Sequence, residues 1–189
     1  KRVLKRLEGV LDARAEKGQV PKGNKPDPIR MNNGYMPRLS GAGTMYPGVD
    51  ERLNQLAEFA TWAVVTNGHH KVQMQRLERS GLLPYFDEVF VSEKMGCTKP
   101  SPRFFDQAMK KLGIRNRERV LVVGDSLGAD IKGGNGARMH TCWCNYSGAE
   151  NHSDIQPTYT IRDLNQLPLI AVGEEELKLA ETREKRHIL

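Results

Sequence analysis

Two pairs of residues carry side chains that commonly bind metal ions. Cys142 and Cys144 flank a tryptophan in a predicted strand, and we expect their thiols to point to opposite faces, where they cannot readily share one ion. His69 and His70 are adjacent at the predicted start of a helix, and adjacent helical side chains point in different directions. We therefore expect the cysteines to be packing residues and the histidines to be surface residues, with no metal shared by either pair.

Further polar residues follow short runs of β-branched residues. Asn67 follows the run Ala63-Val-Val-Thr66, and Asp125 lies one glycine after the run Val120-Leu-Val-Val123. Such runs predict short buried strands of a parallel sheet, separated by helices. Because open α/β sheets bind their ligands at the carboxyl ends of their strands, we expect these polar residues to lie at a ligand-binding edge.

The sequence also indicates the helices that would support this edge. Residues 50–60 place four apolar side chains on one helical face, as a helix that covers a sheet requires. Ser101 and Pro102 are a typical N-cap and first residue of a helix that runs to Gly113. Together with strands predicted within residues 2–7 and at 89–91, this βα alternation predicts a single α/β domain.

Eight short motifs occur in order along the chain. They are Val64-Val-Thr-Asn-Gly68, Gln75-Arg-Leu-Glu-Arg-Ser-Gly81, Tyr85-Phe-Asp87, Ser92-Glu93, Lys99-Pro100, Val122-Val-Gly-Asp-Ser126, Asp130-Ile-x-Gly-Gly134 and Thr141-Cys-Trp143. From Tyr46 to about Ile170 the chain closely resembles the pyrimidine 5'-nucleotidase branch of the haloacid dehalogenase superfamily, over about two thirds of its length. The resemblance implies a Rossmannoid three-layer sandwich with a central parallel sheet.

The resemblance also implies roles for five residues at the predicted edge. Thr66 and the amide of Asn67 match the phosphate-holding second motif, and Lys99 matches the lysine that offsets phosphate charge. Asp125 and Asp130 match the fourth motif, whose carboxylate completes a Mg²⁺ shell. The attacking carboxylate should come from a first motif of the form apolar-apolar-x-D-x-D-G-T-L.

The first motif is degenerate in this chain. Residues 1–11 place Arg6 and Glu8 at the two catalytic aspartate positions. A guanidinium stays protonated, so Arg6 offers neither a lone pair to phosphorus nor a metal ligand. We therefore expect no catalytic residue and no cofactor, with Arg6 paired to Asp125 or Asp130 in place of Mg²⁺. Under this hypothesis Thr66, Asn67 and Lys99 are a remnant phosphate site, and Asp125 and Asp130 a remnant metal site.

Composition divides the chain into four segments. We expect residues 1–11 to form the first strand, 12–45 a Pro- and Gly-rich basic insert, 46–170 the core, and 171–189 a charged helical tail. The related nucleotidases carry a multi-helix cap where the insert lies. Because the insert is short and polar, we expect the cap to be reduced or absent.

Charge and cysteine content restrict the partners and the compartment. The net charge is +6, which favours anionic partners. Three cysteines are a sparse and odd set, which predicts a reducing intracellular compartment, with the mitochondrion as one candidate. No apolar run is long enough to predict a membrane-spanning helix.

Three functional hypotheses follow. The first is an inactive pseudophosphatase that serves as a structural subunit, bound to protein and RNA in an assembly such as a mitochondrial ribosome. The second is a Mg²⁺-dependent phosphatase or pyrimidine 5'-nucleotidase, and the third is a sensor that binds a nucleotide or phosphate without hydrolysing it. The degenerate first motif and the short insert favour the first hypothesis.

Overall fold

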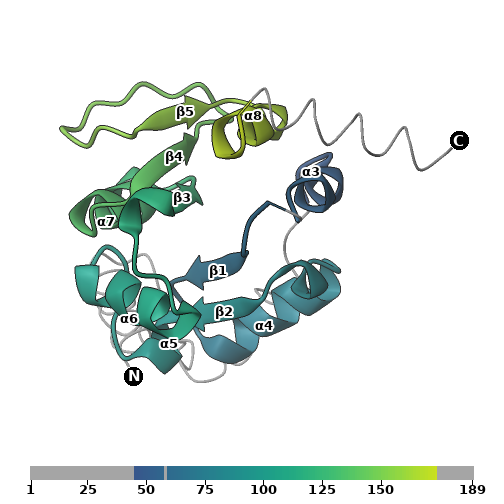
Figure 1. Ribbon diagram of the computed structural model, residues 1–189, viewed down its shortest axis with the longest axis vertical. Helices are drawn as coiled ribbons and strands as arrows, with labels where there is room; N and C mark the ends of the chain where they lie inside the picture. Colours follow the sequence, from purple (N-terminus) through teal and green to yellow (C-terminus); the bar gives the residue numbers. More distant parts are fainter. Residues whose placement is uncertain (1–44, 58, 174–189) are drawn as a thin grey trace, which may run out of the picture.

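The computed structural model describes residues 45–57 and 59–173, in which helices alternate with parallel strands (Figure 1). The elements are, in order, α3 Val49–Leu56, β1 Ala63–Thr66, α4 His70–Arg79, η1 Leu83–Tyr85, β2 Glu88–Val91, α5 Ser92–Met95, α6 Pro102–Leu112, η2 Arg117–Arg119, β3 Leu121–Gly124, η3 Leu127–Ile131, α7 Lys132–Gly136, β4 His140–Cys144, β5 Tyr159–Ile161, η4 Leu164–Gln166 and α8 Leu167–Ala171. Arg6, Glu8 and the strand predicted within residues 2–7 lie outside the described residues, as do nearly all of the insert and most of the tail.

The described strands form two parallel sheets. β1 pairs with β2, with Thr66 opposite Val91, and β4 lies between β3 and β5, with Val123 opposite Cys142. The parallel α/β fold predicted from the sequence is confirmed. Within the described part of the chain β1 and β3 are not hydrogen-bonded to each other, and the strand predicted between them, within residues 2–7, lies outside the described residues.

Two apolar cores cover opposite faces of the three-stranded sheet. In β3, Val122 belongs to the core formed with α6, whereas Leu121 and Val123 pack against the core that contains Leu56 of α3 and Leu167 of α8. Successive side chains of a strand alternate between faces, so β3 serves both cores. Helices α6 and α7 lie on one side of β3 and β4, and α3 and α8 lie on the other (Figure 1). This is a three-layer arrangement.

The local sequence of helix α6 determines where this helix begins and ends and which face is buried. It begins at Pro102 and ends before Gly113, which adopts the left-handed conformation at φ 70°, as helix C-termini favour. Its buried face carries Phe104 and Phe105, which pack edge to face with ring centroids 5.7 Å apart. The predicted helix is confirmed, although the Ser101 side chain makes no capping bond.

None of the described helices is long and apolar enough to cross a lipid bilayer.

The two cysteines of β4 lie on the same side of the sheet. Cys142 and Cys144 are 0% and 8% exposed and belong to the same core, because residues two apart in a strand share a face. The prediction that their thiols point to opposite faces is therefore wrong, although both residues are packed in the interior. Burial raises the pKa of the Cys142 thiol to about 12, so this thiol is protonated at neutral pH.

Candidate functional site

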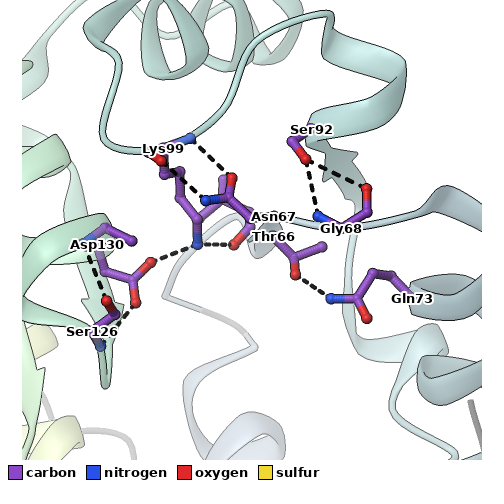
Figure 2. A network of polar contacts seen from close by, with 10 residues as sticks. Thr66, Asn67, Gly68, Gln73, Ser92, Lys99, Ser126 and Asp130 are labelled. Carbon is purple, nitrogen blue, oxygen red and sulfur yellow. Dashed lines mark hydrogen bonds and ion pairs between the residues drawn. The ribbon is translucent and has the colours of Figure 1, made fainter. Parts of the chain in front are cut away.

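The loop after β1 is tied to the loop before α6 by two reciprocal hydrogen bonds (Figure 2). The Asn67 side-chain amide donates to the Lys99 carbonyl oxygen at 3.0 Å, and the Lys99 backbone N–H donates to Asn67 Oδ1 at 2.9 Å. An asparagine amide can do both because it carries donors and an acceptor. The two residues, 32 apart in the sequence, therefore meet at the carboxyl end of β1, as predicted.

Lys99 provides a buried cation at this edge. Its Nζ lies 2.5 Å from Asp130 Oδ1 and 2.6 Å from the carbonyl oxygen of Val65. The Lys99 and Asp130 side chains are only 8% and 9% exposed. An ammonium has three donors, so one donor has no partner among the described residues. The ion pair also joins the end of β1 to the turn after β3.

Asp130 is held from its other side by that turn. Its Oδ2 accepts a hydrogen bond from the Ser126 backbone N–H at 3.1 Å, at the start of the π-helical turn η3. Gly124 leaves room for this carboxylate, because a Cβ at that position would lie 2.5 Å from Asp130 Cγ. Asp130 is thus bound to Lys99 and Ser126. The partner predicted for it, Arg6, lies outside the described residues.

Asp125 is the candidate metal ligand at this edge. Its side chain is exposed and accepts no hydrogen bond from another described residue, while its backbone carbonyl accepts one from Trp143 Nε1 at 3.0 Å. Mg²⁺ is often bound through one or two carboxylates together with phosphate oxygens and water. Asp125 fits this chemistry as one ligand. Within residues 45–57 and 59–173, no group of three or more His, Cys, Asp or Glu could hold a metal ion.

The Thr66 hydroxyl is contacted from helix α4. Nε2 of Gln73 donates a hydrogen bond to Thr66 Oγ1 (Figure 2). Gln73 lies in the first turn of α4, and helical side chains tilt toward the amino end of their helix. The side chain therefore reaches back over the loop that follows β1.

Ser92 and Glu93 hold the same loop from α5. Ser92 Oγ accepts a hydrogen bond from the Gly68 backbone N–H at 2.9 Å. Glu93 accepts one from the His70 backbone N–H at 2.7 Å, and its other carboxylate oxygen lies 3.1 Å from His69 Nδ1. The bond from the His70 backbone and then the contact with His69 lower the pKa of the Glu93 carboxyl. The two histidines thus position a carboxylate.

Four of the five predicted site residues in the described part of the chain meet in one network (Figure 2). They are Thr66, Asn67, Lys99 and Asp130. The fifth, Asp125, directly precedes Ser126 of the same network. Gln73, Ser92 and Glu93 were not predicted as site residues. Their positions in the sequence could have indicated them, because Ser92 directly follows β2 and Gln73 lies in the first turn of α4, after the loop that follows β1.

A sequence model described as haloacid dehalogenase-like hydrolase matches residues 3–138. This chain belongs to the haloacid dehalogenase-like hydrolases. Pyrimidine 5'-nucleotidase YjjG of Escherichia coli (strain K12) is 38% identical over 141 residues, which are 75% of this chain and 63% of YjjG. Pyrimidine 5'-nucleotidase PynA of Streptococcus pneumoniae (strain ATCC BAA-255 / R6) is 36% identical over 147 residues, which are 77% of this chain and 62% of PynA. The chain thus spans less than two thirds of the length of either relative.

Solved structures agree with this haloacid dehalogenase-like assignment. The HAD-hydrolase YfnB of Bacillus subtilis, in a structure bound to magnesium, has a TM-score of 0.75 and 31% identity, over 89% of this chain and 81% of that one. A HAD phosphatase from Thermococcus onnurineus has a TM-score of 0.64 and 30% identity, over 74% of this chain and 63% of that one.

These comparisons overturn the predicted inactive scaffold. The relatives at 38% and 36% identity are named as nucleotidases, and neither is named as a ribosomal or mitochondrial component. The prediction depended on the short insert and on Arg6 and Glu8, which lie in a segment where a short degenerate match decides the alignment. Both residues lie outside the described part of the chain. The prediction of a pseudoenzyme is therefore wrong, and the comparisons support an enzyme.

Proposed function

We propose that the protein is a Mg²⁺-dependent phosphoric monoester hydrolase that acts on pyrimidine nucleoside monophosphates. The Lys99 ammonium carries this proposal. It is buried, it is held by Asp130 and the Val65 carbonyl oxygen, and its third donor has no partner among the described residues, so that it could bind an anion. The names of YjjG and PynA support the substrate class. Because the chain spans less than two thirds of either relative, the activity is proposed for the whole protein that contains it.

In this proposal the described residues bind and orient the phosphoryl group. The Thr66 hydroxyl and the Asn67 backbone N–H donate hydrogen bonds, and Lys99 offsets negative charge. Donors fixed in advance stabilise the charge on the phosphoryl oxygens in the transition state. When bound, Mg²⁺ supplies further positive charge, with Asp125 as its ligand. The attacking carboxylate of the family belongs to the first motif, outside the described residues, and we assign no residue to it.

Phosphate release from UMP and AMP, with and without Mg²⁺, tests this proposal. We expect Mg²⁺-dependent release that is faster from UMP. Lys99→Met and Asp125→Asn should each lower kcat/KM by about 100-fold or more. Lys99→Met removes a positive charge that stabilises the transition state, and Asp125→Asn removes the carboxylate that would bind Mg²⁺. Lys110→Met removes an exposed cation from α6 and is the matched control, with unchanged kcat/KM expected.

The possible outcomes separate the parts of the proposal. Equal turnover of UMP and AMP would contradict the pyrimidine preference alone. Folded protein that gains thermal stability with phosphate but shows no turnover would overturn the hydrolase and favour the non-hydrolysing sensor. Folded protein that neither binds phosphate nor turns over any phosphomonoester would overturn the site assignment itself.

A further inference from the structure

Gln73 contacts the predicted phosphate-binding hydroxyl without being part of the predicted phosphate site. Its Nε2 donates a hydrogen bond to Thr66 Oγ1 (Figure 2). It comes from α4, whereas the other side chains of the network come from the loop after β1, the start of α5, the loop before α6 and the turn after β3. Gln73 therefore restricts the Thr66 hydroxyl from a different element than the other residues of the network.

The direction of this hydrogen bond determines where the threonine proton can go. A hydroxyl has one proton to donate and two lone pairs that accept. Because the Gln73 amide occupies one lone pair, the Thr66 proton cannot be donated to the same nitrogen. The proton is left for an acceptor elsewhere, and a phosphate oxygen at the carboxyl end of β1 is such an acceptor.

We propose that Gln73 is a positioning residue that holds the Thr66 hydroxyl as a hydrogen-bond donor toward the phosphate. The inference rests on the proposed function, because it needs a phosphate at this edge. It adds a residue that never contacts the phosphate and acts only through Thr66. A fixed donor does not need to be reoriented when the anion binds, and this is the benefit of a preorganised site.

Gln73 also packs against the loop, and the two roles can be separated. Its Cγ and Cδ lie 3.4 Å from the place of a Cβ at Gly68, which has a φ of +149°. The methionine of Gln73→Met keeps the length and contacts of the side chain but has no N–H donor. Loss of function in this variant therefore reports on the hydrogen bond rather than on packing.

Affinity for inorganic phosphate, measured by isothermal titration calorimetry, tests the inference without requiring turnover. We expect Gln73→Met to weaken phosphate binding by about tenfold, the effect of one lost hydrogen bond. In a Thr66→Val background the same substitution should change the affinity by less than about twofold, because the hydroxyl it acts on is absent. Gln75→Met, on the same helix and without a hydrogen bond from its side chain to another described residue, is the control and should bind as the wild type does.

Each outcome has a separate meaning. Wild-type protein that does not bind phosphate overturns the role of Gln73, and it overturns the proposed function as well only if no phosphomonoester is turned over. Wild-type protein that binds, with Gln73→Met binding equally well, overturns the role of Gln73. A tenfold loss that persists in the Thr66→Val background shows a structural role only and also overturns it. If Gln73→Met fails to fold in a thermal melt, Gln73→Leu, a good helix former without a donor, carries the same comparison.

Discussion

Lys99 and Asp130 form a buried ion pair, and such a pair depends on both of its members. Moving each charge out of water is costly, and their attraction offsets the cost only while both are present. Their 8% and 9% exposure leaves little solvent to stabilise either charge alone. Both residues should therefore be sensitive to substitution, whatever their part in phosphate binding.

Lys99→Met should lower the free energy of unfolding by about 3–5 kcal/mol, because it leaves the Asp130 carboxylate buried without its cation. Urea unfolding measures this change. The matched control is Lys111→Met, which breaks the exposed pair with Glu88, in which Nζ and Oε2 lie 2.8 Å apart and the side chains are 60% and 34% exposed. That variant should lose no more than about 1 kcal/mol.

Restoring charge balance should recover stability at this position. In the Lys99→Met, Asp130→Asn double variant no charge is left unpaired, so its free energy of unfolding should exceed that of Lys99→Met alone. Equal losses for Lys99→Met and Lys111→Met, or a double variant less stable than Lys99→Met, would show that the buried pair does not control stability here.

At the scale of elements, α7 packs against its neighbours through glycines. A Cβ at Gly134 would lie 2.6 Å from Thr141 Cγ2 of β4 and 3.1 Å from Val122 Cγ2 of β3. Among the residues that the structure describes, a Cβ at Gly136 in the same helix would meet only Pro102 Cγ, at 3.7 Å, which is an ordinary contact. The close approach of α7 to the sheet therefore depends on Gly134 and not on Gly136.

Gly134→Ala should destabilise the protein by about 1–3 kcal/mol, the usual cost of overpacking a core. Gly136→Ala should be neutral or stabilise it by up to about 1 kcal/mol, because alanine is the better helix former. Thermal unfolding of the two variants beside the wild type measures both effects. An alanine at position 134 that is tolerated as well as one at 136 would contradict the packing described here.

At the scale of the whole molecule, the core between the sheet and helices α3 and α8 contains ionisable groups. The Cys142 and Cys144 thiols and the Tyr146 hydroxyl all have pKa values raised by burial. Tyr146 also stacks on Tyr46, with ring centroids 4.2 Å apart. These groups are neutral in the folded protein at neutral pH. Alkaline pH should therefore lower the free energy of unfolding, because deprotonation would place charges in this core.

Cys142 allows the sign of this effect to be worked out. Its pKa is 9.0 in an unfolded chain and about 12 in the folded protein. Above pH 9 the unfolded chain loses the proton that the folded protein keeps, so the free energy of unfolding should fall as pH rises toward 12. At about pH 10.5 the loss from this thiol should be about 1–2 kcal/mol.

Urea unfolding at about pH 8 and pH 10.5 measures this loss. Lysines and tyrosines titrate in the same range, so the relevant quantity is the difference between wild type and Cys142→Ala. The variant should be less stable at pH 8, because it leaves a cavity, but should lose less stability on alkalinisation. Cys97→Ala, at a partly buried thiol, is the matched control, and a pH dependence of Cys142→Ala equal to that of the wild type would contradict the prediction.

The sequence alone located β1, β2, β3 and α6 and placed polar residues at the ends of strands. The signals for β3, for α6 and for Thr66 and Asn67 are local, because β-branched runs, a Ser-Pro start and a closing glycine act through neighbouring residues. The motifs spread along the chain also identified the family correctly. Activity was predicted wrongly, because that prediction depended on Arg6 and Glu8 in a short degenerate match and on the short polar insert.

Only the tertiary structure decided which polar groups are partners. Lys99 pairs with Asp130, 31 residues away, and Ser92 binds Gly68, 24 residues away. No local pattern specifies such contacts, because they depend on how loops from separate elements pack at one edge of the sheets. The same reason explains why Gln73 was missed, since its contact with Thr66, the last residue of β1, forms only when α4 folds back over the end of that strand.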